Sequence, residues 1–167
     1  MNWLDAFTPD LYVARVEVIT PELLHKHGLR GLLLDLDNTL LDNYAQHFES
    51  HILEWANKVR AQGIELCIVT NAPPERTCTL AQALGVPGIP RARKPLISGL
   101  LAGLKRLGLR PDQAAMVGDQ IFTDVWAGNR AGLFTILVMP TSPHESWLTR
   151  WKRPLERRVL ARLAGRG

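Results

Sequence analysis

The chain has 167 residues, of which 46% are apolar and 22% are charged, values typical of one globular domain with a sizeable core. It contains no run of about 18 apolar residues and no basic, apolar leader, so we expect neither a membrane-spanning helix nor a secretion signal, and we expect a cytoplasmic protein. The net charge of +4 is concentrated in residues 144–167, which hold seven Lys or Arg and two Glu, so an anionic surface is the expected neighbour of this basic tail.

Residues 1–30 are interpreted as an N-terminal segment that packs on the core. Thr20 has the side chain of a helix N-cap, and Pro21 suits the first helical position. A short helix is therefore predicted from Pro21 to about His27, with Gly28 as its end.

Residues 31–143 alternate between strand and helix patterns. The apolar run that starts at Gly31 predicts a strand buried on both faces, and the periodic residues 51–62 and the apolar residues 64–70 add a helix and a second buried strand. Further helices are predicted at residues 75–84, 96–107 and 121–131, further strands at 114–119 and 133–138, and a loop rich in Pro and Gly at 86–90. This order predicts an α/β fold with a doubly wound, mostly parallel, Rossmann-like sheet, followed by the basic tail at 144–167, with a single domain overall.

Two carboxylates, Asp35 and Asp37, stand at the end of the first buried strand. Ligands of open α/β sheets bind beyond the carboxyl ends of the strands, so these acids lie where chemistry is expected. Taken alone, Asp37 and the two polar residues after it could equally form a capped turn. The next strands also end in polar groups, Thr70 with Asn71 and then Asp119, and this recurrence favours a functional site.

The residue types at these strand ends suit phosphoryl chemistry. Thr70, Asn71 and the cation of Lys94 can meet the negative charge on a phosphoryl group. Asp35 and Asp119 offer the carboxylate oxygens that Mg²⁺ prefers. A carboxylate nucleophile splits a difficult displacement into two steps, and a second carboxylate two residues further along can exchange the proton with the leaving oxygen and then with water.

Four short motifs of this chain resemble, in order and with compatible spacing, those of the haloacid dehalogenase (HAD) superfamily. They are Asp35-Leu-Asp37-Asn-Thr39, Thr70-Asn71, Lys94-Pro95 and Gly118-Asp119-Gln-Ile-Phe-Thr-Asp124.

The resemblance implies a role for each matching position. Asp35 is the expected nucleophile and a metal ligand. Asp37 is the expected general acid and base, and its backbone carbonyl is a further metal ligand. Thr70 and the Asn71 amide are expected to bind phosphate, and Lys94 to neutralise the charges of nucleophile and phosphate.

Asp119 is expected to complete the Mg²⁺ site and Asp124 to orient Lys94 or a metal-bound water, with Thr39 and Gly118 in supporting positions. The carboxylate at Asp37 favours a phosphatase over a dehalogenase, because the alkoxide that leaves a phosphate ester needs a proton.

The spacing of the motifs also bears on the substrate. Asn71 lies 34 positions after Asp37, and Lys94 lies 23 after Asn71, so neither interval has room for a large cap domain. Superfamily members without a cap tend to have an open site, which suits a large or surface-bound phosphate ester.

A closer resemblance covers nearly the whole chain, from Pro9-Asp10-Leu11-Tyr12-Val13 to the basic close at Leu155–Leu160. The chain is similar to the YqeG family of HAD phosphatases of subfamily IIIA type, which is related to the mitochondrial and plastid phosphatidylglycerophosphate phosphatases. Family members often carry Pro-Trp shortly after the first motif, whereas this chain has Leu41-Asp42-Asn43-Tyr44, so contacts at the rim of the site are expected to differ.

Apolar residues recur every fourth position in the tail, with basic residues between them. The apolar positions are Trp147, Trp151, Leu155, Val159 and Leu163. This pattern suits peripheral docking on an anionic membrane, and it suits equally a helix that packs on the body with its basic face in water. Binding of the tail to RNA is less expected, because no RNA-binding motif accompanies the charge, and binding to DNA is not expected.

Other candidate residues are interpreted as structural or left open. Cys67 and Cys78 are expected to be reduced and structural, and the pair His47 and His51 lacks a third ligand at a metal-binding spacing. Arg91 and Arg93 either belong to a solvated loop or, beside Lys94, contact phosphate or a lipid headgroup.

The sequence thus predicts a Mg²⁺-dependent phosphomonoesterase that forms an aspartyl-phosphate and acts, by resemblance, on phosphatidylglycerophosphate in phospholipid synthesis at the inner face of a membrane. Two alternatives are a phosphatase for a soluble phosphorylated metabolite and an assembly factor whose basic tail meets RNA or a ribosome.

Overall fold

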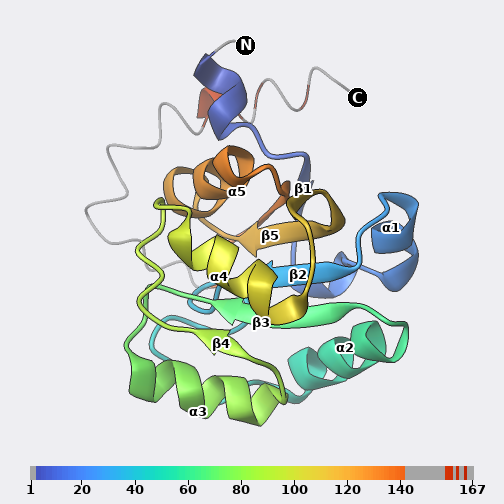
Figure 1. The fold of residues 1–167 in the computed structure, drawn as a ribbon, viewed down its shortest axis with the longest axis vertical. Helices are drawn as coiled ribbons and strands as arrows, with labels where there is room; N and C mark the ends of the chain where they lie inside the picture. Colours follow the sequence, from blue (N-terminus) through green and yellow to red (C-terminus); the bar gives the residue numbers. More distant parts are fainter. Residues whose placement is uncertain (1–2, 142–156, 160, 162–163, 165–167) are drawn as a thin grey trace.

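A fully parallel six-stranded sheet forms the centre of the protein (Figure 1). The computed structural model describes residues 3–141, 157–159, 161 and 164. The strand order across the sheet is β1-β6-β5-β2-β3-β4. The strands are β1 (Leu11–Val13), β2 (Gly31–Leu34), β3 (Glu65–Val69), β4 (Gly88–Ile89), β5 (Ala114–Gly118) and β6 (Phe134–Val138). The predicted doubly wound α/β fold is confirmed.

The centre of the sheet is buried on both faces, as the unbroken apolar run in β2 predicts. Side chains of successive strand residues point to opposite faces. Accordingly Leu32 and Leu34 belong to one hydrophobic cluster and Leu33 belongs to a second. These two clusters therefore lie on opposite sides of the sheet.

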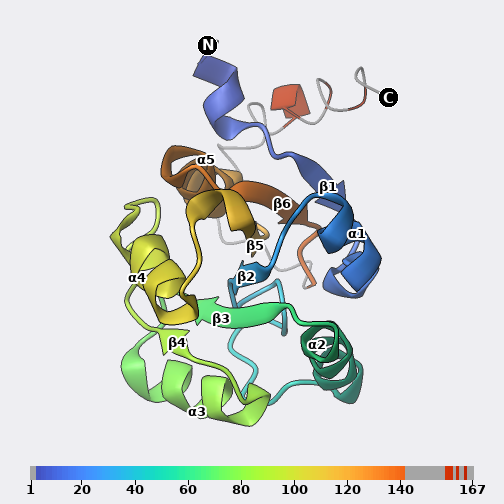
Figure 2. The same cartoon turned by 45° about the vertical axis from the view of Figure 1, so that its right-hand side comes forward.

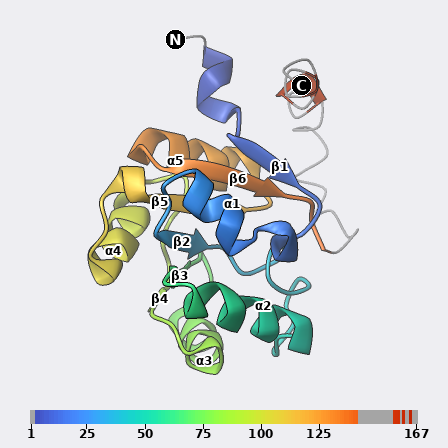
Figure 3. The ribbon, with the colours of Figure 1, turned by 90° about the vertical axis from the view of Figure 1, so that its right-hand side faces the viewer.

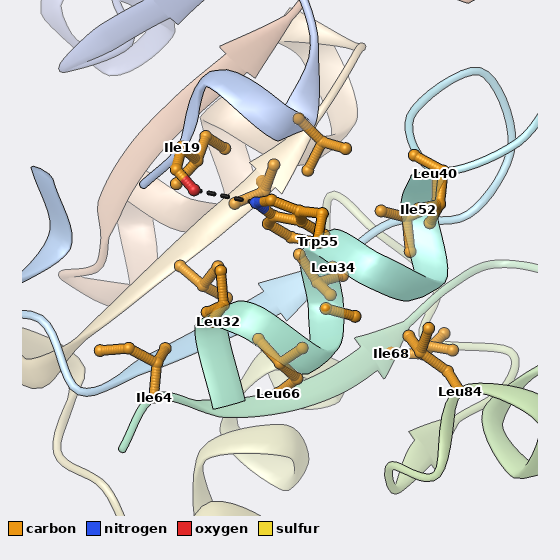
Figure 4. Packing of buried hydrophobic residues seen from close by; sticks show 14 of the residues in the cluster. Ile19, Leu32, Leu34, Leu40, Ile52, Trp55, Ile64, Leu66, Ile68 and Leu84 are labelled. Carbon is orange, nitrogen blue, oxygen red and sulfur yellow. Dashed lines mark hydrogen bonds between the residues drawn. The ribbon is translucent and has the colours of Figure 1, made fainter. Parts of the chain in front are cut away.

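Helices cover both faces, as Figures 2 and 3 show. On the first face lie α1 (Pro21–Lys26), α2 (Ser50–Ala61) and α3 (Pro74–Leu84). Trp55 of α2 is buried on this side, and its indole Nε1 donates a hydrogen bond of 2.9 Å to the carbonyl of Ile19 (Figure 4). On the second face lie α4 (Ser98–Leu107) and α5 (Trp126–Ala131).

Helix ends follow their local chemistry. The Thr20 hydroxyl accepts a hydrogen bond of 3.2 Å from the backbone N–H of Leu23, which confirms the predicted cap of α1. Helix α4 lies close to the sheet because Gly103 has no side chain: a Cβ there would come within 2.9 Å of the Val69 side chain.

Several short elements were not predicted. The N-terminal segment adds the edge strand β1, which pairs with β6, and the expected loop at residues 86–90 contains the two-residue strand β4. Three 3₁₀ turns, η1 (Trp3–Phe7), η2 (Val16–Val18) and η3 (Pro111–Gln113), complete the connections. The predicted helix at 121–131 begins as a π-helical turn, η4 (Ile121–Val125), a distortion that is frequent at functional sites.

The chain order places a topological switch beside β2. From β2 the chain adds β3 and β4 on one side, whereas β5 and β6 lie on the other side. The crevice beyond the carboxyl ends of β2 and β5 is therefore the expected ligand site of this sheet. Residues 35–49 and 85–97, the connections that could have carried a cap, hold no inserted domain. Within the part of the chain that the structure describes, no helix is both long and apolar enough to cross a bilayer.

Part of the basic tail packs on the body. Residues 157–159 are helical, and the Val159 side chain is fully buried against Ile121, Val125 and Leu137. This contact is the one that the packing alternative predicts for Val159. The other apolar positions of the tail pattern, Trp147, Trp151, Leu155 and Leu163, lie outside the described residues.

Candidate functional site

The buried ammonium group of Lys94 joins two carboxylates beyond the strand ends. Its Nζ donates to Asp35 Oδ1 at 2.8 Å and to Asp124 Oδ1 at 2.7 Å. Burial by itself would lower the pKa of Lys94, but the adjacent Asp124 and Asp35 carboxylates outweigh it and raise the pKa. Lys94 is therefore a fixed cation directly beside Asp35.

The side chain of Asn71 holds the backbone of Lys94. Asn71 Nδ2 donates to the Lys94 carbonyl at 3.2 Å, and the Lys94 N–H donates to Asn71 Oδ1 at 2.8 Å. Arg91 and Arg93, in the loop before Lys94, have φ values of 46° and 57°, a left-handed conformation that is uncommon outside glycine. Because the Asn71 side chain makes hydrogen bonds to the Lys94 backbone, the phosphate contact that the sequence predicts for Asn71 would be made by its backbone amide.

Gly118 makes room for Asp124. A Cβ at Gly118 would overlap the Asp124 carboxylate. The Asp124 side chain is buried, and besides the bond to Lys94 its Oδ2 accepts a hydrogen bond of 3.1 Å from the N–H of Gln120, at the start of the π-helical turn. Gly118 and Asp124, two of the three residues expected to support the site, thus depend on each other sterically.

Three acidic side chains crowd together at the ends of β2 and β5. One oxygen each of Asp35, Asp119 and Asp124 lies within 4.8 Å of the others, the one such group of potential metal ligands among the described residues. Burial, and then repulsion from Asp124 and Asp35, raises the pKa of Asp119 to about 8. Burial also raises the pKa of Asp35, although Lys94 opposes the shift. A cation bound here would relieve this repulsion.

The donors fit a hard divalent cation. Carboxylate oxygens are the ligands that Mg²⁺ takes, usually one or two together with water and phosphate oxygens. Both oxygens of Asp124 are engaged by Lys94 and Gln120, so Asp35 and Asp119 are better placed as direct ligands. The buried Thr39 hydroxyl lies 3.5 Å from Asp119 Oδ1, in the position of a supporting group.

Asp37 is paired with Arg76, a residue that the sequence analysis missed. Arg76 donates from Nη1 to Asp37 Oδ2 at 2.8 Å and from Nη2 to Asp37 Oδ1 at 2.7 Å. The same Nη2 donates to the carbonyl of Ala45 at 2.9 Å, and the N–H of Tyr44 reaches Asp37 Oδ1 at 3.3 Å. The guanidinium lies at the start of α3, 39 positions from Asp37 in sequence, and only the fold brings the two together.

A cavity of about 430 Å³ opens in front of these groups. Its lining includes both predicted acids, the phosphate-binding candidates and the unpredicted arginine: Asp35, Asp37, Thr70, Asn71, Arg76 and Lys94. Thr70 is buried, and its hydroxyl accepts a hydrogen bond of 3.1 Å from the N–H of Ala72, which orders the turn after β3. The fold therefore gathers residues of all four motifs at one edge of the sheet.

Two groups of residues lie apart from this centre. Arg91 and Arg93 are exposed and do not line the cavity. The His51 imidazole lies on the surface, 3.1 Å from Glu17 and 3.3 Å from Glu49. Neither arrangement contributes to the acidic cluster at the strand ends.

Comparison with known proteins gives matches of sequence and of fold. The family model of the haloacid dehalogenase-like hydrolases matches residues 48–132. The "Probable phosphatase YqeG" of Bacillus subtilis (strain 168) is 35% identical over 161 residues, which cover 96% of this chain and 94% of that protein.

More distant similarities extend to proteins with named substrates. A chloroplastic phosphatidylglycerophosphate phosphatase 1 of Chlamydomonas reinhardtii is 28% identical over 165 residues, covering 86% of this chain and 61% of that protein. The cobalt-bound deoxy-D-mannose-octulosonate 8-phosphate phosphatase of Haemophilus influenzae matches with a TM-score of 0.56 at 14% identity, covering 67% of this chain and 69% of that one. At that identity the structural match shows a shared fold alone.

Proposed function

The chain belongs to the haloacid dehalogenase-like hydrolases, in the family of the phosphatase YqeG, and on this premise we propose that it hydrolyses phosphate monoesters through an aspartyl-phosphate on Asp35. Membership of this family identifies the protein as a hydrolase that acts on phosphate esters. The roles of individual residues and the substrate are our proposal. The observation that carries the mechanism is the Asp35 carboxylate at the end of β2, 2.8 Å from the Lys94 ammonium group and beside Asp119.

Asp35 is the proposed nucleophile. One of its carboxylate oxygens attacks phosphorus, the bond from phosphorus to the ester oxygen breaks, and the proton that the leaving oxygen needs comes from Asp37. Water then attacks the phosphorus of the aspartyl-phosphate, Asp37 takes the proton of this water, and Asp35 leaves as the carboxylate. Phosphate is released and both acids return to their starting forms.

The remaining residues position charge. Lys94 keeps a cation beside the nucleophile and is held by Asp124 and by the Asn71 side chain. The Thr70 hydroxyl and the Asn71 backbone amide are placed to meet phosphoryl oxygens. Mg²⁺ held by Asp35 and Asp119, with the Asp37 carbonyl as a third donor, would supply further positive charge to the phosphoryl oxygens.

Phosphatidylglycerophosphate is the proposed substrate. Similarity to the algal phosphatidylglycerophosphate phosphatase supports it, although the chain spans only 61% of that protein. The uncapped site and the basic composition of residues 144–167 suit a substrate embedded in an anionic surface. We therefore propose peripheral association with the inner face of a membrane.

A substrate panel tests this proposal. The activity of the Mg²⁺-loaded protein is compared on phosphatidylglycerophosphate in mixed micelles and on soluble sugar phosphates and nucleoside monophosphates, with Asp35→Asn as the inactive control. The proposal predicts the highest kcat/KM for the lipid, and a higher value for a soluble ester would overturn the substrate assignment.

Vesicle flotation, compared with an RNA gel-shift assay, separates the lipid proposal from an RNA-directed role. Binding to anionic vesicles, lost in neutral vesicles and at high salt, is the expected result. Binding to RNA without binding to vesicles would instead favour an assembly factor.

A further inference from the structure

The contact between Arg76 and Asp37 conflicts with the proposed use of Asp37. Both carboxylate oxygens of Asp37 accept hydrogen bonds from the one guanidinium of Arg76, at 2.7 and 2.8 Å. An acid that protonates a leaving oxygen must have one oxygen free for the proton and for the substrate. Asp37 must therefore separate from Arg76, at least in part, before it can act.

An arginine at position 76 is energetically unfavourable for two local reasons. Arg76 is the third residue of α3, in the first turn, where the helix dipole disfavours a cation. Its Nε is buried without a hydrogen-bond partner within the described part of the chain, which also costs free energy. Proteins tend to break such local rules at functional sites.

The position of Arg76 indicates what that function is. Its guanidinium lines the same cavity as Lys94 and Asp35, on the side of Asp37. Under the proposed mechanism the leaving oxygen and the alcohol part of the substrate lie on this side, because Asp37 donates the proton to that oxygen. A guanidinium released from Asp37 keeps only the neutral Ala45 carbonyl among its described acceptors, so a new anion is favoured, and the alcohol part of the substrate is placed to bring one.

We propose that Arg76 selects phosphate monoesters whose alcohol part carries a second negative charge close to the ester, and that binding of this anion releases Asp37 for proton transfer. The inference rests on the proposed phosphatase function and narrows its substrate class. A phosphodiester or a carboxylate three carbons from the ester oxygen fits equally, since a guanidinium binds both by paired hydrogen bonds.

A matched pair of soluble probes tests the anion independently of any lipid. Glycerol 3-phosphate and 3-phosphoglycerate differ only in that a hydroxymethyl group is replaced by a carboxylate. Because a hydrogen bond to a charged group is worth about 1.5–3 kcal/mol, the natural protein should prefer 3-phosphoglycerate by about 10- to 100-fold in kcat/KM. Arg76→Gln should reduce this ratio to near one, whereas Arg76→Lys should keep part of it.

Binding without turnover provides the second measurement. The dissociation constants of both probes are determined by calorimetry in the Asp35→Asn protein with Mg²⁺, with and without Arg76→Gln. Arg110→Gln is the matched control, because Arg110 is an exposed arginine whose guanidinium pairs with Asp112 alone among the residues that the structure describes. The preference should vanish with Arg76→Gln and persist with Arg110→Gln.

The outcomes separate this inference from the proposed function. An unchanged ratio in Arg76→Gln, with kcat lowered equally for both probes, would mean that Arg76 only positions Asp37 and would overturn the inference. If the ratio collapses but phosphatidylglycerophosphate is not hydrolysed, the inference holds and the lipid assignment fails. If the lipid is hydrolysed equally well with and without Arg76, the lipid assignment holds and the inference fails.

Discussion

Replacing Gly118 by Ala should impair catalysis through Asp124, a residue with no direct part in the proposed bond changes. The added Cβ would overlap the Asp124 carboxylate, which is anchored by Lys94 and by the N–H of Gln120. Asp124 must move, and the hydrogen bond of 2.7 Å to Lys94 must lengthen or break. Since Lys94 also contacts Asp35, the cation beside the nucleophile shifts as well.

Two terms set the size of the effect. Overpacking a buried site costs about 1–3 kcal/mol of stability, and loss of a charge-assisted hydrogen bond adds about 1.5–3 kcal/mol. A displacement of about 1 Å at catalytic groups typically lowers the rate about 100-fold. Gly118→Ala should therefore lower both the melting temperature and kcat.

Gly128→Ala is the matched control. A Cβ at Gly128 would come within 2.6 Å of the Thr135 side chain, so it should cost similar overpacking energy, yet neither residue lines the cavity. Turnover of p-nitrophenyl phosphate with Mg²⁺ and thermal unfolding are measured for both variants. If Gly118→Ala kept kcat within threefold of the natural protein, or if Gly128→Ala lost as much activity as Gly118→Ala, the steric link from Gly118 to Lys94 would be refuted.

Three further predictions concern other parts of the site and fold. Because the pKa of Asp119 is raised to about 8 in the metal-free protein, the free energy of unfolding should fall as the pH rises from about 4 to 8. Added Mg²⁺ should therefore raise the melting temperature more at pH 8 than at pH 5. An equal gain at both pH values would contradict this. Asn71→Ala removes both hydrogen bonds to the Lys94 backbone and should lower kcat by about 10- to 100-fold, while the circular dichroism spectrum stays normal. An unchanged kcat would show that the loop holds Lys94 without Asn71. Val159→Ala should cost about 1.5 kcal/mol of unfolding free energy in urea denaturation, from the loss of buried methyl groups; no measurable change would argue against packing of this residue on the body.

The fold and the clustering of the main candidate residues were predictable because their signals are local. The strands β2 and β5 are unbroken apolar runs, and β3 is apolar after its first residue, Glu65. Each of the three is followed by a polar group that parallel pairing brings to the same edge of the sheet. The cap of α1 at Thr20 is likewise predictable from the three consecutive residues 20–22. Elements of this kind need no knowledge of distant contacts.

The missed features depend on distant contacts. The strands β1 and β4 have three and two residues, too short for a periodic pattern, and they exist because β6 and β3 present free edges to them. Arg76 meets Asp37 only after α3 has packed against the sheet. The one local signal was a basic side chain in the first turn of a helix, an unfavourable position that could have been flagged.

We propose that Asp35 carries the phosphoryl group during turnover. Acid quenching during turnover of p-nitrophenyl phosphate, followed by reduction with borohydride, converts an aspartyl-phosphate into homoserine, which peptide mass spectrometry can locate. We expect homoserine at position 35 in the natural protein and none in Asp35→Asn, whose kcat should fall by more than about 1,000-fold. Homoserine at position 37 or 119, or activity of Asp35→Asn within about tenfold of the natural protein, a barrier change of only about 1.4 kcal/mol, would contradict it.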